Sequence, residues 1–314
     1  MFSGTMVRAN HQGNAAKYSG GAATMFDLFQ SVIDYPNIDP IWFTIPVPFA
    51  DFGLPIRWYS LAYIAGIVLA WWYVAKMIRL PGSPLAKRHV DDLVTWITIG
   101  VIGGGRVGSI LFYNPERYFG PDGSLINMLK LWEGGMSFHG GVLGVTLAIV
   151  LYSLKEKLAM LRLGDYIACS IPFGLFFGRL ANFINGELWG RPTDVPWAMV
   201  FPTGGNVPRH PSQLYEAGLE GLVLFGILWF LFWKTDARYH PGKLTGTFLM
   251  GYGSFRFLVE FLRTPDANLG FLTLGLTMGQ WLSVPMILVG AWLIITSKTR
   301  RHRVEPIAGT AAQQ

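Results

Sequence analysis

Residues 59–78 read Tyr-Ser-Leu-Ala-Tyr-Ile-Ala-Gly-Ile-Val-Leu-Ala-Trp-Trp-Tyr-Val-Ala-Lys-Met-Ile, twenty positions in which Lys76 is the one charged side chain. About 20 apolar residues in a helix cross the hydrocarbon core of a bilayer, which is roughly 30 Å thick. The segment therefore predicts a membrane-spanning helix. The composition agrees, because 51% of the 314 residues are apolar and 14% are charged, whereas soluble domains carry about 25% charged residues.

Six further apolar segments are long enough to cross a bilayer, which makes seven in all. They lie at about 92–113, 138–155, 165–185, 213–233, 244–262 and 278–297. The second, fourth and sixth spans are rich in glycine and less hydrophobic, so we expect them inside the bundle. The sequence thus predicts an all-α fold, a polytopic bundle of seven transmembrane helices.

The loop charges predict the orientation, because cytoplasmic loops are enriched in lysine and arginine. One set of loops carries most of the basic residues: Lys76, Arg79, Lys87, Arg88, Lys155, Lys157, Arg162, Lys234, Arg238, Lys243, Lys298, Arg300, Arg301 and Arg303. The alternate loops carry fewer. We therefore expect the N-terminus on the outer side of the membrane and the C-terminus in the cytoplasm.

The stretches outside the spans predict the remaining organisation of the chain. Residues 1–30 are expected to be a poorly ordered tail, since the polar start of the chain lacks the apolar core of a signal peptide. Residues 31–297 form the integral-membrane domain. Within it, residues 186–212 are rich in proline and glycine and predict a small periplasmic cap between spans four and five. Residues 298–314 predict a basic cytoplasmic tail.

The composition also excludes several kinds of site. Cys169 is the single cysteine, which excludes an internal disulfide and a multi-cysteine metal site. It lies in an apolar stretch, so we interpret it as a packing residue. The sequence predicts neither a metal nor another cofactor. The net charge of +6 does not indicate nucleic-acid binding, because the basic residues cluster between the apolar segments.

Three arginines fall inside predicted spans: Arg106, Arg179 and Arg256. An arginine at the centre of a membrane helix costs about 2.5–3.5 kcal/mol, so each needs a partner or a wet cavity. We expect the three to converge in the outer half of the bundle and to bind an anion such as a lipid phosphate, which a guanidinium group holds through two parallel hydrogen bonds. The alternative is pairing with Glu260, Glu187 or backbone carbonyls.

A polar stripe follows the sixth span. Tyr252, Arg256 and Glu260 recur every four residues, and Arg263 follows Arg256 by seven, so all four share one helical face. Such a face cannot contact lipid and predicts a polar interior. We expect Glu260 to neutralise and orient Arg256. Arg263 is either a ligand of the substrate or a residue whose head reaches the membrane interface.

The fourth span ends in Gly178-Arg-Leu-Ala-Asn-Phe-Ile-Asn-Gly-Glu187. Arg179 and Asn182 are three residues apart and share a face. Packing alone does not explain two asparagines and Glu187 near the end of an apolar helix. We expect Asn182 and Asn185 to supply neutral hydrogen-bonding groups beside the guanidinium group of Arg179.

Two histidines are candidates for a general base. His139, in Trp132-Glu-Gly-Gly-Met-Ser-Phe-His-Gly-Gly141, lies at the outer boundary of the third span. A neutral imidazole there can accept a proton from a thiol or hydroxyl; the alternative is a contact that shapes the loop or binds phosphate. His210 is the second candidate. Three residues that follow it are equally well explained as helix caps and interfacial anchors: Gln213, Tyr215 and Glu216.

Four motifs resemble the signatures of the bacterial prolipoprotein diacylglyceryl transferases. They are Gly134-Gly-Met-Ser-Phe-His-Gly-Gly141, Gly178-Arg-Leu-Ala-Asn-Phe-Ile-Asn-Gly-Glu187, Arg209-His-Pro-Ser-Gln-Leu-Tyr-Glu216 and Gly251-Tyr-Gly-Ser-Phe-Arg-Phe-Leu-Val-Glu-Phe-Leu-Arg-Thr-Pro-Asp266. The resemblance runs in order from about residue 35 to 297, and it departs from the signature at Ala181, where glycine is usual. It implies transfer of the diacylglyceryl group of phosphatidylglycerol to the lipobox cysteine of a preprolipoprotein, with release of glycerol-1-phosphate.

The resemblance also implies residue roles. The family's catalytic and binding positions carry over onto Tyr59, His139, Arg179, Asn182, Glu187, Tyr252, Arg256, Glu260 and Arg263. We expect His139, Arg179 and Arg256 to be catalytic, and the others to bind substrate together with Arg106 and His210.

Two other functions compete with this transferase. A transporter or flippase of an anionic lipid also needs buried arginines, but it predicts internal symmetry that the sequence lacks. A structural subunit of a membrane complex does not explain the inward polar residues.

Overall fold

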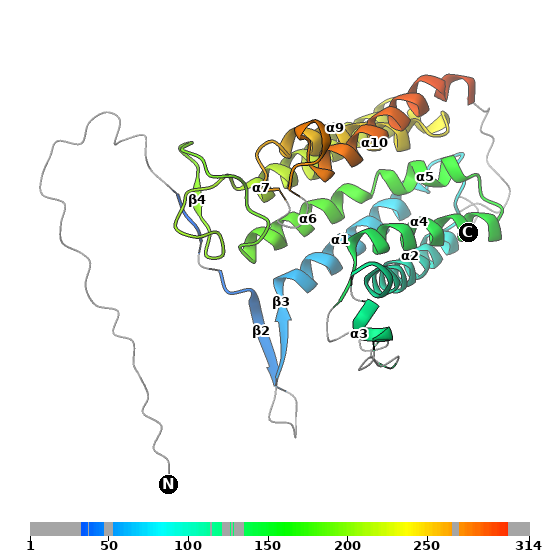
Figure 1. Ribbon diagram of the computed structural model, residues 1–314. Coiled ribbons are helices and arrows are strands. Elements are labelled where there is room, and N and C mark those ends of the chain that lie inside the picture. The colour runs from blue at the N-terminus through cyan, green and yellow to red at the C-terminus, as the bar shows by residue number, and fades with distance from the viewer. Residues whose placement is uncertain are drawn as a thin grey trace, which may run out of the picture.

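The computed structural model describes residues 33–36, 38–46, 53–113, 115–120, 126, 128, 135–265 and 270–300. The tail predicted at residues 1–30 and the part of the C-terminal tail after residue 300 lie outside these ranges. The described chain is mostly helical, and its helices run side by side in an elongated bundle from which a short β-hairpin projects (Figure 1).

Each of the seven predicted spans is helical. Their α-helices are α1 (Trp58–Met77), α2 (Lys87–Gly108), α4 (Phe138–Lys155), α5 (Met160–Ala168), α6 (Ile171–Ile184), α7 (Ser212–Glu216), α8 (Leu224–Lys234), α9 (Lys243–Val259) and α10 (Met278–Thr296). Shorter elements are α3 (Pro115–Phe119), the π-helices Ser109–Tyr113 and Ala217–Val223, and the 3₁₀ helices Ala237–Tyr239, Thr273–Gly275 and Ser297–Arg300. The fourth span is interrupted between α5 and α6, and the fifth runs through α7, a π-helix and α8 without a break.

Five helical segments of the described chain are long and apolar enough to cross a membrane: Trp58–Met77, Lys87–Phe112, Met160–Ile184, Ser212–Lys234 and Met278–Arg300. The other two predicted spans are short, since α4 has 18 residues and α9 has 17. A helix of 17 residues covers about 25 Å, less than the roughly 30 Å of a bilayer core. The structure thus agrees with a polytopic helical membrane protein.

Two small β-structures qualify the all-α prediction. Strands β2 (Ile41–Pro46) and β3 (Gly53–Arg57) form an antiparallel hairpin that leads into α1 (Figure 1). The sequence of β2 is rich in β-branched and aromatic residues, which favour strands. Strand β1 (Ile33–Asp34) pairs in parallel with β4 (Met199–Val200), so the start of the described chain is attached to the loop between α6 and α7.

Close packing of glycines brings the helices of the bundle together. A Cβ atom on Gly104 of α2 would lie 2.4 Å from the carbonyl oxygen of Gly140 of α4, and one on Gly246 of α9 would lie 2.7 Å from that of Gly290 of α10. Small residues let membrane helices approach in this way. The α1 helix packs against α6, and α9 also packs against α5.

The start of α9 is fixed by a buried carboxylate. Asp165 on α5 accepts hydrogen bonds from the backbone N–H groups of Gly242 and Thr245, both at 2.8 Å, and from the Thr245 hydroxyl at 2.9 Å. A side-chain oxygen that satisfies free N–H groups stabilises the first turn of a helix. This contact sets the position of α9 relative to α5, and α9 carries two of the predicted site residues, Tyr252 and Arg256.

Candidate functional site

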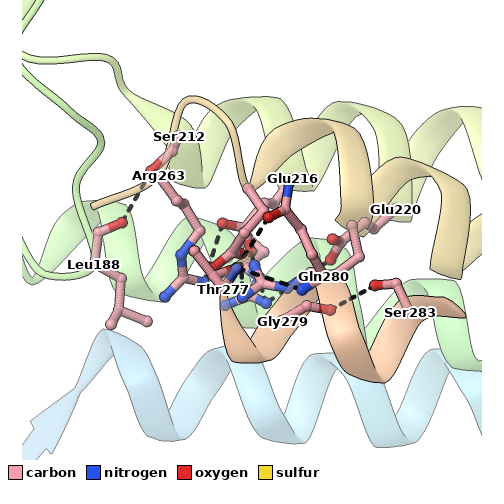
Figure 2. A network of polar contacts seen from close by, with 12 residues as sticks. Leu188, Ser212, Glu216, Glu220, Arg263, Thr277, Gly279, Gln280 and Ser283 are labelled. Atoms are coloured by element: carbon pink, nitrogen blue, oxygen red, sulfur yellow. Dashed lines mark hydrogen bonds and ion pairs between the residues drawn. The ribbon is translucent and has the colours of Figure 1, made fainter. Parts of the chain in front are cut away.

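A cluster of buried charges lies where α6, α7 and the end of α9 meet. Glu216, the last residue of α7, has a side chain that is 1% exposed. Its Oε2 lies 2.6 Å from Nη2 of Arg179 and 3.4 Å from Nη1 of Arg256. Its Oε1 lies 3.3 Å from Nη1 of Arg263, and Figure 2 shows these two side chains pointing toward each other. One carboxylate therefore joins three arginines, and we call this group with Glu220 and Glu260 the arginine cluster.

Glu260 is the second carboxylate of the arginine cluster. Its Oε2 lies 2.8 Å from Nη2 of Arg256, one turn earlier on the chain, which confirms the predicted pairing. Glu260 also lies against the first turn of α10, where a Cβ atom on Gly279 would come within 2.8 Å of the same oxygen. That turn is held by reciprocal hydrogen bonds between Thr277 and Gln280 (Figure 2). The glycine gives the carboxylate room beside the helix.

A hydrogen-bonded network extends from Arg179 along the end of α6. Nη1 of Arg179 lies 3.5 Å from Oδ1 of Asn182, and Nδ2 of Asn182 donates to Oε1 of Glu187 at 2.8 Å. Asn185 donates to the same oxygen at 3.4 Å. The side-chain amide of Gln213 donates to the backbone carbonyl of Glu187 at 2.6 Å, which ties the network to α7. The sequence-predicted neighbours of Arg179 thus do contact it or each other.

Two tyrosines border the arginine cluster. Tyr252 lies one turn before Arg256 on α9, and its side chain interacts electrostatically with that of Arg179. Tyr59 is in the first turn of α1, which packs on α6, and it is also within electrostatic reach of Arg179. The ring of Tyr59 lies 5.1 Å from that of Tyr63. Both predicted tyrosines therefore lie beside the cluster.

Arg106 and His139 belong to the other part of the bundle, formed by α2 and α4. Arg106 is buried, and it donates to the backbone carbonyls of Met128 at 2.8 Å and Gly135 at 3.1 Å. Pairing with backbone carbonyls, the alternative considered for the three arginines, is thus observed for Arg106. His139 is exposed in the first turn of α4, which packs chiefly on α2. The roles of both residues toward a substrate remain predictions.

His210 lies two residues before the start of α7. Its Nδ1 is 3.1 Å from the hydroxyl of Tyr215, and that hydroxyl accepts a hydrogen bond from Trp197 at 2.6 Å. Burial lowers the pKa of His210, which favours the neutral imidazole. The three side chains line one end of a pocket of about 540 Å³ whose other lining residues are mostly apolar, among them Leu219 and Leu258.

Comparison with known proteins identifies the family of the chain. The family model described as prolipoprotein diacylglyceryl transferase matches residues 46–296. The chain belongs to this family. That range includes α1 to α10 and every residue of the arginine cluster. The membership confirms the resemblance of the four motifs, and it does not favour a lipid transporter.

Three relatives, each named phosphatidylglycerol–prolipoprotein diacylglyceryl transferase, are similar over most of their length. The protein of Zymomonas mobilis is 54% identical over 280 residues, which are 87% of this chain and 96% of the relative. That of Erythrobacter litoralis is 54% identical over 263 residues, 82% of this chain and 92% of the relative. That of Rhodospirillum rubrum is 51% identical over 278 residues, 88% and 97% of the two chains.

Sequence reasoning missed two residues of the arginine cluster. For Glu216 a role as helix cap or interfacial anchor was left open, whereas its buried carboxylate is paired with three arginines. Glu220 was not considered; it is fully buried, and its Oε2 lies 3.8 Å from Nη2 of Arg179. A carboxylate inside an apolar span is costly, as an arginine is. The spacing of four between Glu216 and Glu220 was the signal that could have found both.

Proposed function

We propose that this chain transfers the diacylglyceryl group of phosphatidylglycerol to the lipobox cysteine thiol of a preprolipoprotein and releases glycerol-1-phosphate. The observation that carries the proposal is the set of three arginines, Arg263 buried and Arg179 and Arg256 partly buried, gathered on one carboxylate between membrane helices. The relatives support it, because their names contain both the lipid and the protein substrate.

Arg179 and Arg256 bind the phosphate group of the lipid. Their side chains are 18% and 16% exposed, whereas that of Glu216 is 1% exposed, so each arginine contacts Glu216 on its buried side and retains an accessible side. A guanidinium group has five N–H donors, more than these ion pairs use. The same donors stabilise the negative charge that develops on the departing glycerophosphate. Tyr59, Asn182, Glu187, Tyr252, Glu260 and Arg263 surround and orient this site.

The transfer is a substitution at carbon. A base, for which His139 is our candidate, takes the proton of the incoming thiol. The thiolate attacks the glyceryl carbon that carries the phosphate ester, a C–S bond forms, and the C–O bond breaks with its electron pair left on the phosphate oxygen. No covalent intermediate with the enzyme forms. The reaction needs no metal or other cofactor in this scheme, because the arginines supply the positive charge.

The membrane topology that fits this function has seven spans, with α4 and α9 completing the set. The N-terminus and the loop 186–212 are periplasmic, the basic C-terminal tail is cytoplasmic, and the arginine cluster faces the periplasmic leaflet of the inner membrane. Cys169 is buried, so single reporter cysteines can test this. An Asp194→Cys variant should react with an impermeant maleimide in intact spheroplasts and a Lys155→Cys variant only after lysis; the reverse pattern contradicts this orientation.

The activity itself can be tested with defined components. The purified full chain is mixed with phosphatidylglycerol and a peptide that contains a lipobox cysteine. We expect the peptide to gain the mass of one diacylglyceryl group, and glycerol-1-phosphate to appear in equal amount. A peptide with serine in place of the cysteine is the matched control. An unmodified cysteine peptide under conditions in which the chain is folded contradicts the proposal.

A further inference from the structure

Glu220 is a buried acid that the transfer scheme above does not use. It lies in the π-helix Ala217–Val223, one turn after Glu216, and Figure 2 shows both residues along this continuous helical segment. Its side chain is 0% exposed. Neither of its carboxyl oxygens has a hydrogen-bond partner among the residues that the structure describes. π-Helical turns inside α-helices frequently mark functional sites.

Arg179 is closer to Glu216 than to Glu220. The same nitrogen, Nη2 of Arg179, lies 2.6 Å from Glu216 and 3.8 Å from Glu220. Glu216 also has Arg256 and Arg263 as partners, so its negative charge is well compensated. A buried carboxylate without hydrogen-bond donors is unstable as an ion, and a neighbouring carboxylate makes its ionisation still less favourable. Of the two acids, Glu220 is therefore the one that holds a proton.

The charge count of the arginine cluster then matches the substrate. Three guanidinium groups and the paired carboxylates of Glu216 and Glu260 leave one net positive charge, whereas an ionised Glu220 would leave none. The charged and titratable groups that act electrostatically on Glu220 are Glu216 from its own helix, Arg179 from α6, Tyr252 and Arg256 from α9, and Arg263 from the residues after α9. A phosphodiester headgroup carries one negative charge, so the protonated form complements it and the ionised form does not.

We infer that Glu220 carries a proton in the resting protein and thereby sets the arginine cluster to one net positive charge, matched to a monoanionic phospholipid headgroup. This deepens the proposed function and rests on it. Glu220 acts here as a positioning residue for charge and does not itself touch the lipid. Loss of its proton at alkaline pH removes the net positive charge and weakens the binding of phosphatidylglycerol.

The test measures phosphatidylglycerol binding to the full chain in phosphatidylcholine nanodiscs, without peptide, at neutral and at alkaline pH. We expect the Kd of the wild-type protein to rise by at least roughly tenfold at alkaline pH, the effect of about 1.4 kcal/mol. In a Glu220→Gln variant the side chain is neutral at every pH, so the Kd should not change with pH. Glu116→Gln, at an exposed acid of α3, is the control and should behave as wild type.

Infrared spectroscopy gives a second measurement that does not depend on binding. The wild-type protein at neutral pH should show the carbonyl stretch of a protonated carboxylic acid, which is absent in Glu220→Gln and displaced in Glu220→Asp. The inference is overturned by the absence of this band, by a wild-type Kd that does not depend on pH, or by an equal pH dependence in Glu220→Gln. Neither measurement requires transfer, so a failure of the peptide to gain mass would reject the proposed function separately.

Discussion

Arg106 and Arg179 are both arginines within apolar helical segments, but they have different partners. Arg106 on α2 donates to the backbone carbonyls of Met128 and Gly135. Arg179 on α6 is paired with the carboxylate of Glu216, lies 3.8 Å from Glu220 and is joined to Asn182. Both side chains need a partner inside an apolar segment. The contacts of Arg106 include carbonyl oxygens of the connection between α2 and α4, and those of Arg179 include acids from another span.

The difference shows how one residue type serves two purposes in a membrane protein. The carbonyl contacts of Arg106 fix the connection between α2 and α4. Carboxylate partners hold Arg179, Arg256 and Arg263 close together in spite of their mutual repulsion. We therefore expect substitutions in the arginine cluster to affect phosphate binding and transfer, and substitutions at Arg106 to affect mainly the local structure.

The largest effect is expected for Glu216→Gln, which removes the negative charge that three arginines share. Breaking a buried ion pair at one partner costs about 3–5 kcal/mol. Transfer from phosphatidylglycerol should fall at least roughly a hundredfold, and the melting temperature should fall as well. Both are measured beside Glu116→Gln, which changes the same group at an exposed position. Wild-type transfer by Glu216→Gln would show that the arginines do not need their shared carboxylate.

A smaller loss is expected for Gly279→Ala on α10. The new methyl group would lie 2.8 Å from Oε2 of Glu260, so this flexible carboxylate has to move away from Arg256. We expect transfer to fall about tenfold with little change in melting temperature, since only a side chain is displaced. Gly226→Ala is the matched control, because nothing lies within 4 Å of its added Cβ atom. Equal transfer by both variants would show that Arg256 does not depend on the position of Glu260 for its function.

Arg106→Gln tests the expectation that Arg106 mainly supports the local structure. The variant loses hydrogen bonds to two carbonyls, and such a bond contributes about 1.5–3 kcal/mol when one partner is charged. We expect a lower melting temperature and slower transfer, with a Kd for phosphatidylglycerol within about threefold of wild type. Titration of the lipid into the purified variant measures this Kd. If the Kd rose as much as in a variant of the arginine cluster, Arg106 would be a substrate-binding residue, as the sequence predicted.

The smallest effect is expected from His210 as the pH falls. Its pKa is lowered by burial in the folded protein, whereas an unfolded histidine titrates near pH 6.5. Protonation therefore favours the unfolded state, so the stability contribution is complete above about pH 6.5 and decreases as the pH falls below that value. Melting curves of wild type and His210→Gln should diverge slightly on acidification. Parallel curves would mean that the imidazole ionises as readily in the folded protein.

The sequence predicted the helices well, because long apolar segments are the strongest signal that a chain contains. Phe138–Lys155 has the predicted bounds, and Met278–Thr296 differs from its prediction by one residue. The hairpin of β2 and β3 was missed because its short strands lie outside the apolar segments. The break between α5 and α6 was also missed, since hydropathy does not change at Cys169 and Ser170.

The site was predicted in part, since the cost of a buried charge is visible in a sequence but its partner is not. The Arg256–Glu260 pair and the contact of Arg179 with Asn182 follow from helical spacing within one helix. The pairing of Arg179 with Glu216 joins two helices that are adjacent only in the folded chain. Spacing along one helix contains no information on such a contact, and this is why Glu216 and Glu220 were not recognised.

The most direct test of the account is the affinity of an Arg179→Ala variant for phosphatidylglycerol, measured in phosphatidylcholine nanodiscs without peptide. Arg79→Ala, which removes an exposed arginine just after α1, is the control. We expect the Kd of Arg179→Ala to rise at least roughly a hundredfold, since it loses a charge-assisted contact to phosphate, while Arg79→Ala stays within about twofold of wild type. Wild-type affinity in Arg179→Ala would contradict the claim that the arginine cluster binds the lipid phosphate.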